Sequence, residues 1–487
     1  MNSTRTERQR AAHMEGVAAP ISVAAVERPN ALTREARRYA IGEVVSRAGV
    51  SAAWSKTWRI EISDQSATIH LDSTGKKRIV FPVDHAPNGT PHSIVSGKTS
   101  RAAWAYPPGA NLRDSVPDFV LPFVGRSQTG GISPVFAASD RETIRFNFDL
   151  PAATLFTLAR VEETVISERD SHGRFPASAS IAVKEDFLHR PIVDEYGFAL
   201  EQALQCLMPQ WSAERKPLRV KLSHDVDVIG IPFSLRSTVG HTFQRRSPRA
   251  TIQDFLSLVT KRKPVYLESL SQFAKLSTDH ALDSAFYWKA SAAGKNDSGY
   301  DLGNAKVTST LCWLKERGFE SGVHPGYETF HSQQKLRDEV DKLRQCIGND
   351  ELGGRQHYLR WLPETWRHWE ACGLAYDSSV GFADRIGFRA GTCLPYRPWL
   401  WEENREANLL EIPLLVMDRT LAYYMKLSPQ ESFLRVLNCL ERCRAVGGVF
   451  TMLWHNEALL DPVYGDLYSR LLKCLSGAAR FDWRAKN

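Results

Sequence analysis

The sequence predicts an α/β protein in which an irregular seven-stranded (β/α) barrel follows a smaller mixed α/β domain. Two observations lead to this prediction. Apolar strand-like runs alternate with helical patterns from about residue 218 onward, whereas short alternating runs occupy residues 57–160. A polar stretch that ends in Pro217 separates the two regions. The length of 487 residues agrees with more than one domain, since a domain takes roughly 150 residues.

The N-terminal region reads as a tail followed by a folded domain. Its first residues are rich in Ala, Arg, Ser and Thr without periodicity, which is typical of a mobile tail. A helix is expected to open around Thr33, and alternating residues predict strands at 58–62 and 66–71. The expected division is a mobile tail (1–33), an N-terminal α/β domain of unassigned role (34–212) and the barrel (216–487).

The C-terminal region carries clear helix signals between its strands. Ser428 and Glu431 form a capping box with proline at the first helical position, and Gly447–Gly448 ends that helix. Apolar residues at helical spacing over 336–347 predict another helix. Such alternation favours parallel strands joined by helices. The candidate strands are 218–224, 284–288, 319–325, 354–359, 374–379, 409–416 and 448–455.

Composition excludes several classes of function. The net charge of +7 is a small surplus of 62 basic over 55 acidic residues, and clusters such as Lys261–Lys263 lack a basic-aromatic stripe, so no nucleic-acid partner is expected. No run of about 18 apolar residues or apolar signal segment is present, so we expect neither a membrane span nor export. The cysteines form no CxxC pair, and Cys439 and Cys443 suit helix packing in a reducing compartment. A cytoplasmic protein is expected.

Polar side chains follow four of the candidate strands. Reactive groups of (β/α) barrels cluster at the carboxyl ends of the strands. Two carboxylates and three histidines that converge there suit one divalent metal, a general base and a general acid. The residues in question are Asp225, Asp227, His324, Arg355, His357 and His455.

The order of these groups resembles carbohydrate esterase family 4, the polysaccharide deacetylases with the NodB homology domain. The resemblance covers residues 216–487 and rests on Asp-x-Asp, a histidine after a strand, an arginine at a strand end and Leu453–Trp454–His455. The likeness is closer to a bacterial branch that has His-Asp-Val-Asp in its first motif, as at His224–Asp227, and segments like Gly387–Thr392. Members of that branch often carry a preceding α/β domain of unassigned role, which the stretch from His172 to Tyr196 resembles.

The resemblance implies a NodB-like barrel and a metal-dependent hydrolase that removes N-acetyl or O-acetyl groups from a saccharide or glycoconjugate precursor. It implies one divalent metal, with zinc expected. It makes Asp225 the general base, Asp227 and His324 metal ligands, and His455 the general acid, with Arg355 steadying the base. A valine separates the two aspartates, which are adjacent in the usual motif, so their roles could be exchanged.

The third metal ligand is predicted separately. The usual motif has a second histidine four residues after the first, but Glu328 stands four residues after His324. Glu328 and His331 would both need a helix directly after a Pro-Gly pair. His357 needs no helix, because alternation along a strand would turn it to the same side as Arg355. We therefore favour His357.

Substrate contacts and two other functions complete the predictions. Tyr327 is expected to stack on a sugar ring, Trp454 to contact substrate beside the last motif, and Arg389 to meet an acidic or phosphorylated saccharide. A catalytically silent carbohydrate-binding protein is one alternative, favoured by the missing second histidine. A metal-independent hydrolase of a small ureide or cyclic amide is the other.

Overall fold

The computed structural model describes residues 32–83, 100–102, 118–121, 134–230, 265–348 and 351–484. The predicted tail, apart from its last two residues, and the basic cluster at 261–263 lie outside the described residues.

The N-terminal half contains a five-stranded sheet of order β1-β2-β3-β7-β6, in which only the pair β3 and β7 is parallel, and a separate pair, β4 and β5. Thr33 caps the first helix by accepting a hydrogen bond from the Ala36 amide at 3.1 Å, which confirms the predicted helix start. The strands expected at 58–62 and 66–71 are confirmed as β1 and β2. The elements are α2 (Arg34–Arg47), α3 (Ala52–Ser55), β1 (Arg59–Ile62), β2 (Ser66–His70), β3 (Arg78–Pro82), β4 (Ser100–Ala102), β5 (Phe119–Leu121), β6 (Phe136–Ala138), β7 (Thr143–Phe146), α6 (Leu150–Leu158), α7 (Val161–Val165), η1 (Ala177–Ala179), α8 (Ile181–Lys184) and α9 (Ile192–Leu207).

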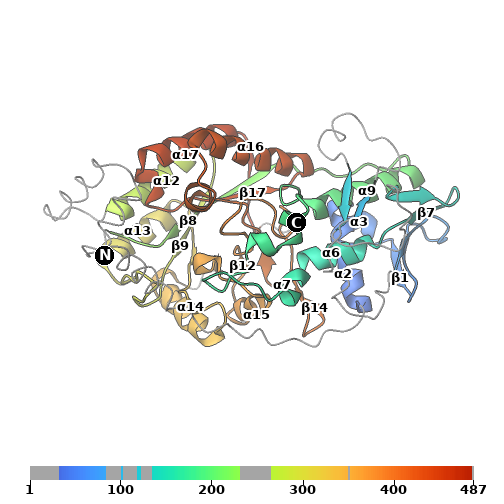
Figure 1. Cartoon of the computed structure of the whole chain (residues 1–487). Helices are drawn as coiled ribbons and strands as arrows, with labels where there is room; N and C mark the ends of the chain where they lie inside the picture. Colours follow the sequence, from blue (N-terminus) through green and yellow to red (C-terminus); the bar gives the residue numbers. More distant parts are fainter. Residues whose placement is uncertain are drawn as a thin grey trace, which may run out of the picture.

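The C-terminal half is built on a parallel sheet of order β15-β12-β11-β10-β9-β8-β17-β16, with β18 also paired to β8. Helices alternate with its strands and cover its outer face (Figure 1). The predicted helices are confirmed as α14 and α16, and Gly447 ends α16 in the left-handed conformation at φ 64°. The main elements are β8 (Arg219–Val226), α12 (Val265–Asp279), β9 (Ser284–Trp288), α13 (Ala305–Glu316), β10 (Glu320–Val323), α14 (Gln333–Ile347), β11 (Gly353–Gly354), η2 (His357–Leu359), α15 (Pro363–Ala371), β12 (Tyr376–Asp377), β15 (Leu410–Glu411), β16 (Val416–Met417), η3 (Thr420–Tyr424), α16 (Pro429–Val446), β17 (Val449–Leu453), η4 (Ala458–Leu460), α17 (Pro462–Leu475) and β18 (Ala479–Arg480). A small antiparallel pair, β13 (Trp399–Leu400) and β14 (Arg405–Glu406), lies apart from this sheet.

The strand predicted at 409–416 is two short strands, β15 and β16. β15 pairs with β12, whereas β16 pairs with β17. The first and last strands of the sheet therefore belong to one chain segment, and the sheet curls as in a (β/α) barrel. Between them, the Thr451 hydroxyl of β17 accepts from the Leu415 amide at 3.0 Å and donates to the Pro413 carbonyl. The exact number of seven strands stays a prediction.

The strand predicted at 354–359 was too long, since β11 contains only Gly353 and Gly354. A Cβ atom on Gly354 would lie 1.9 Å from the Val323 carbonyl oxygen, so only glycine permits this close approach of strands. The chain then turns, because Tyr358 and Leu359 have φ of 61° and 54°.

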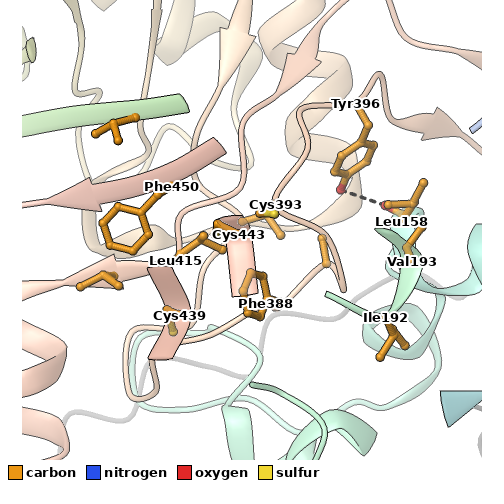
Figure 2. Close-up of a cluster of buried hydrophobic side chains, with 14 of the residues drawn as sticks. Leu158, Ile192, Val193, Phe388, Cys393, Tyr396, Leu415, Cys439, Cys443 and Phe450 are labelled. Carbon is orange, nitrogen blue, oxygen red and sulfur yellow. Dashed lines mark hydrogen bonds between the residues drawn. The ribbon is translucent and has the colours of Figure 1, made fainter. Parts of the chain in front are cut away.

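One continuous core joins the two halves of the protein. Figure 2 shows Leu158 and Val193 of the N-terminal half in the same apolar cluster as Phe388 and Cys393. The Val193 amide donates to the carbonyl of Gly391 at 2.8 Å, and Gly391 has φ of 62°. Cys439 and Cys443 pack in this core, and all eight cysteines are free thiols. Within the described residues, no helix has both the length and the apolar character needed to cross a bilayer.

A buried charge cluster also crosses between the halves. The Glu163 carboxylate accepts from Arg389 Nε at 2.9 Å and from Arg160 Nε at 2.8 Å. Burial alone raises the pKa of Glu163, but the charges of Arg389 and Arg160 outweigh it and lower the pKa. The carboxylate therefore stays ionised inside the protein.

Removing this charge should destabilise the whole chain. We expect Glu163→Gln to lower the free energy of unfolding by about 3 kcal/mol, because it leaves a buried guanidinium without its counter-charge. Glu441→Gln, which breaks an exposed pair with Arg444, should cost less than about 0.5 kcal/mol. Urea denaturation measures both, and equal costs would contradict the structural role of Glu163.

Candidate metal centre

Strand β8 presents its polar residues to two different environments. His224 packs on the Phe273 ring at 3.8 Å and donates from Nδ1 to the Trp454 carbonyl at 2.8 Å. Burial lowers the pKa of His224 to about 4, so this histidine is a neutral packing residue. Because side chains alternate along a strand, Asp225 and Asp227 face the side opposite to His224. The valine between the aspartates is what lets them share a face.

Asp227, His324 and His357 form a buried group whose ligand atoms all lie within 4.8 Å of one another. Asp227 Oδ1 is 3.2 Å from the Nε2 atom of each histidine. Two ligands of a tetrahedral zinc ion, each about 2.0–2.1 Å from the metal, lie about 3.3 Å apart. Asp227 Oδ1 is also buried without a hydrogen-bond partner among the described residues. The donor set and its spacing therefore fit a metal ion.

The other nitrogen of each histidine is held by a neighbouring group. His324 Nδ1 donates to the Arg355 carbonyl at 2.7 Å, and His357 Nδ1 lies 2.8 Å from Asp297 Oδ1. Donation from Nδ1 of His324 leaves its Nε2 lone pair free for a metal. His357 Nδ1 lies 2.8 Å from Lys289 Nζ as well as from Asp297, and it leaves Nε2 free in the tautomer that donates to Asp297. Lys289 lies 2.5 Å from Asp297 Oδ1, and Asp297 keeps a pKa below its ordinary value because His357 and Lys289 outweigh its burial.

Asp225 is fixed by Arg355 beside this group. Asp225 Oδ1 accepts from Arg355 Nη1 at 2.9 Å, while Arg355 Nε donates to the Ser378 carbonyl at 2.9 Å. Asp225 Oδ2 is 3.7 Å from His324 Nδ1, the nitrogen that is bonded to a carbonyl. Both side chains are buried. Arg355 therefore holds one oxygen of the Asp225 carboxylate, Oδ1, and the other oxygen, Oδ2, faces His324.

His455 lies on the other side of Asp227, with Nε2 at 3.8 Å from Asp227 Oδ2. His455 Nδ1 donates to Asp418 Oδ1 at 2.6 Å, and its amide donates to Asp418 Oδ2 at 3.0 Å. Burial and Arg419 lower the pKa of His455, but Asp418 outweighs them and raises it. The dyad therefore favours the imidazolium.

Sequence reasoning missed Asp418, Asp297 and Lys289. Asp418 follows the apolar residues of β16, and Lys289 directly follows β9. The strand-end pattern that found the other candidates could have found these two. Asp297 lies in a loop, and no sequence signal marks it.

The alternative third ligands lie apart from this group. The side chains of Glu328 and His331 are 53% and 43% exposed and lie 3.8 Å from each other. Their exposure and mutual pairing do not favour them as ligands.

All three predicted substrate contacts are buried side chains. Trp454 is fully buried against Tyr468, with ring centroids 5.3 Å apart, because alternation on β17 turns it outward toward the helices. Arg389 is buried and paired with Glu163. Tyr327 is 9% exposed, and the Arg360 guanidinium lies 3.7 Å from its ring centroid, so the ring offers little surface for the expected sugar stacking. Its amide lies 2.9 Å from Asp297 Oδ2 and its hydroxyl 3.1 Å from His172 Nδ1.

Comparisons with known proteins match parts of the chain. Residues 95–209 match a family described as a family of unknown function (DUF7033). No curated protein matches this chain. Among solved structures, a protein from Mycobacterium smegmatis assigned as a polysaccharide deacetylase shares 14% identity, with 57% of this chain and 97% of that chain covered and a TM-score of 0.33.

Two further solved structures have other assignments. An allantoinase shares 13% identity, with 57% of this chain and 90% of that chain covered and a TM-score of 0.38. A CE4 family pseudoenzyme from Bacillus anthracis shares 12% identity, with 55% of this chain and 64% of that chain covered and a TM-score of 0.27. All three TM-scores lie below 0.5, so the assignment of function rests on the site's own geometry.

The geometry predicts one divalent metal ion per chain. Purified protein should contain about one zinc by elemental analysis, and Asp227→Asn, His324→Ala and His357→Ala should each remove it. Glu328→Ala and His331→Ala serve as matched controls and should keep the metal. Loss of zinc in Glu328→Ala with retention in His357→Ala would contradict this ligand set.

Proposed function

We propose that the chain is a metal-dependent hydrolase of the polysaccharide deacetylase type, which removes N-acetyl or O-acetyl groups from a saccharide or glycoconjugate precursor. The observation that carries this proposal is the buried group of Asp227, His324 and His357, flanked by a carboxylate held by an arginine and by a histidine held by a carboxylate. This arrangement offers a metal site, a general base and a general acid together.

Asp227, His324 and His357 would hold the metal, and two imidazoles with one carboxylate suit zinc. When bound, such an ion lowers the pKa of a water molecule and polarises a carbonyl group. The presence of His357 supports an active enzyme over a silent binding protein, because it offers the third ligand that the sequence lacks four residues after His324.

Asp225 acts as the general base in this proposal. Arg355 holds Oδ1, so Oδ2 is the oxygen that takes the proton of the attacking water. The distances favour this assignment over the exchanged one. Asp227 Oδ1 lies 3.2 Å from two Nε2 atoms, whereas Asp225 faces only a histidine nitrogen that already donates elsewhere.

His455 acts as the general acid. Asp418 binds Nδ1 and stabilises the imidazolium, so Nε2 carries the proton that passes to the departing amine or alcohol. Without that proton the tetrahedral intermediate returns to substrate. The products are acetate and a deacetylated sugar, and a cytoplasmic enzyme would meet lipid-linked or nucleotide-linked precursors.

Removal of either acid-base residue should abolish most activity. We expect Asp225→Asn and His455→Ala each to lower turnover by about two to four orders of magnitude while zinc stays bound. Acetate release from an N-acetylated glucosamine oligosaccharide, measured with and without a chelator, tests both claims. Full activity of metal-free protein would overturn the proposal. If Asp225→Asn empties the site and Asp227→Asn does not, the two aspartates have exchanged roles.

Asp418→Asn tests the positioning of the acid. An amide cannot stabilise the imidazolium, so we expect kcat to fall about 100-fold with little change in KM. Zinc content should match that of the unmodified chain, because Asp418 binds His455 and not the metal group. An unchanged kcat would show that His455 does not act as the acid.

A further inference from the structure

A turn from the N-terminal half, Asp170–Arg174, lies against the barrel beside the metal group. Asp170 fixes its shape, since Oδ1 accepts from the amides of His172 and Arg174 at 2.9 Å each and Oδ2 accepts from Arg174 Nε at 2.8 Å. Gly173 completes the turn with φ of 72°. His172 is therefore presented by a rigid support.

His172 contacts two tyrosines that adjoin the metal-binding residues. Its Nδ1 lies 3.1 Å from the Tyr327 hydroxyl, and its ring centroid lies 4.7 Å from that of Tyr358. Tyr358 directly follows His357, and the amide of Tyr327 donates to Asp297, which holds His357. The two tyrosines thus connect the turn directly to the residues around the metal group.

Arg174 binds a further tyrosine, Tyr424, beside the turn. Its Nη1 donates to the Tyr358 carbonyl at 2.9 Å and its Nη2 donates to the Tyr424 hydroxyl at 3.3 Å. Tyr424 ends η3, six residues after Asp418, and is 42% exposed. Arg174 itself is buried. A half-buried histidine and an exposed tyrosine are thus held on either side of Tyr358, the residue that follows His357.

These exposures distinguish the turn from a contact that only stabilises the fold. The ion pair between Glu163 and Arg389, which also joins the halves, has both side chains 2% exposed. His172 and Tyr424 keep surface that a ligand can reach. An accessible aromatic ring beside a hydrogen-bonding group suits a sugar, whose C–H face packs on the ring while its hydroxyl groups bind the polar side chain.

We propose that the Asp170–Arg174 turn is one wall of the substrate-binding site, and that His172 and Tyr424 bind the sugar unit next to the one that loses its acetyl group. This inference rests on the proposed function. Arg174 is a positioning residue, since its donors hold Tyr358 and Tyr424. The turn lies within residues 95–209, which match the family of unknown function, so the proposal gives this region a part in the saccharide site.

The test compares binding of two saccharides to the full-length, zinc-loaded chain that carries Asp225→Asn, because this change is expected to keep zinc bound and to prevent turnover of the probe. The probes are N-acetylglucosamine and its β-1,4-linked tetrasaccharide, with Kd measured by saturation-transfer NMR. We expect His172→Ala and Tyr424→Ala each to weaken tetrasaccharide binding about tenfold, as loss of one hydrogen bond or stacking contact would. Monosaccharide affinity, zinc content and melting temperature should stay unchanged, and His172→Gln should recover part of the affinity.

His189→Ala is the matched control. His189 is another half-exposed histidine of the N-terminal half, and it lies 4.0 Å from Asp186. The inference is overturned if the tetrasaccharide binds no tighter than the monosaccharide, or if His172→Ala and Tyr424→Ala bind it as well as His189→Ala does. Binding of the tetrasaccharide through His172, without acetate release by the chain that keeps Asp225, would contradict the proposed hydrolase and leave this inference intact.

Discussion

The Asp227 carboxylate is buried with one oxygen between two imidazole nitrogens, and the rest of the site is arranged around it. A buried carboxylate is costly unless charge or hydrogen bonds compensate for it. Arg419 lies 3.4 Å from the second oxygen, but the first has no hydrogen-bond partner among the described residues. A cation held by Asp227, His324 and His357, as proposed, would resolve this imbalance. Protonated His455 is favoured nearby by the Asp418 carboxylate, which raises the pKa of His455 against its burial and the charge of Arg419.

The packing of the two halves supports this chemistry as well as stability. The buried pair of Glu163 and Arg389 holds the barrel segment that carries Gly391 against the N-terminal half. Close packing of this kind has low compressibility and few voids, so elements on either side of the interface keep a fixed relation. The Asp170–Arg174 turn therefore keeps a fixed place beside the metal group, and no hinge movement is needed to bring it there. A stabilising interface thus also positions the residues proposed to bind substrate.

The sequence predicted those strands and helices whose apolar residues recur with a strong period. It also predicted the candidate site residues that follow strands. β8 and α16 lie where alternation and capping residues indicated. The extent of β11 could not be read, because it depends on contacts of Gly354 with a neighbouring strand. Arg389 reads as a binding residue until its partner, 226 positions away, is known. The direction of Trp454, in contrast, could have been predicted, because neighbouring side chains alternate along a strand and Trp454 and His455 therefore point to opposite sides.

The proposed third ligand illustrates how a local departure in sequence changes the architecture of a site. After His324 the chain has Pro325 and Gly326 and forms turns rather than a helix, so a side chain four residues later faces solvent. In the proposed site His357 takes that position from the next strand end, at the start of a turn in which Tyr358 has positive φ. That backbone is strained for a tyrosine, and the bond from Arg174 to its carbonyl helps to hold it. Placing the third ligand on this turn therefore links the metal site to the N-terminal half, a dependence that a ligand on the first histidine's own segment would not create.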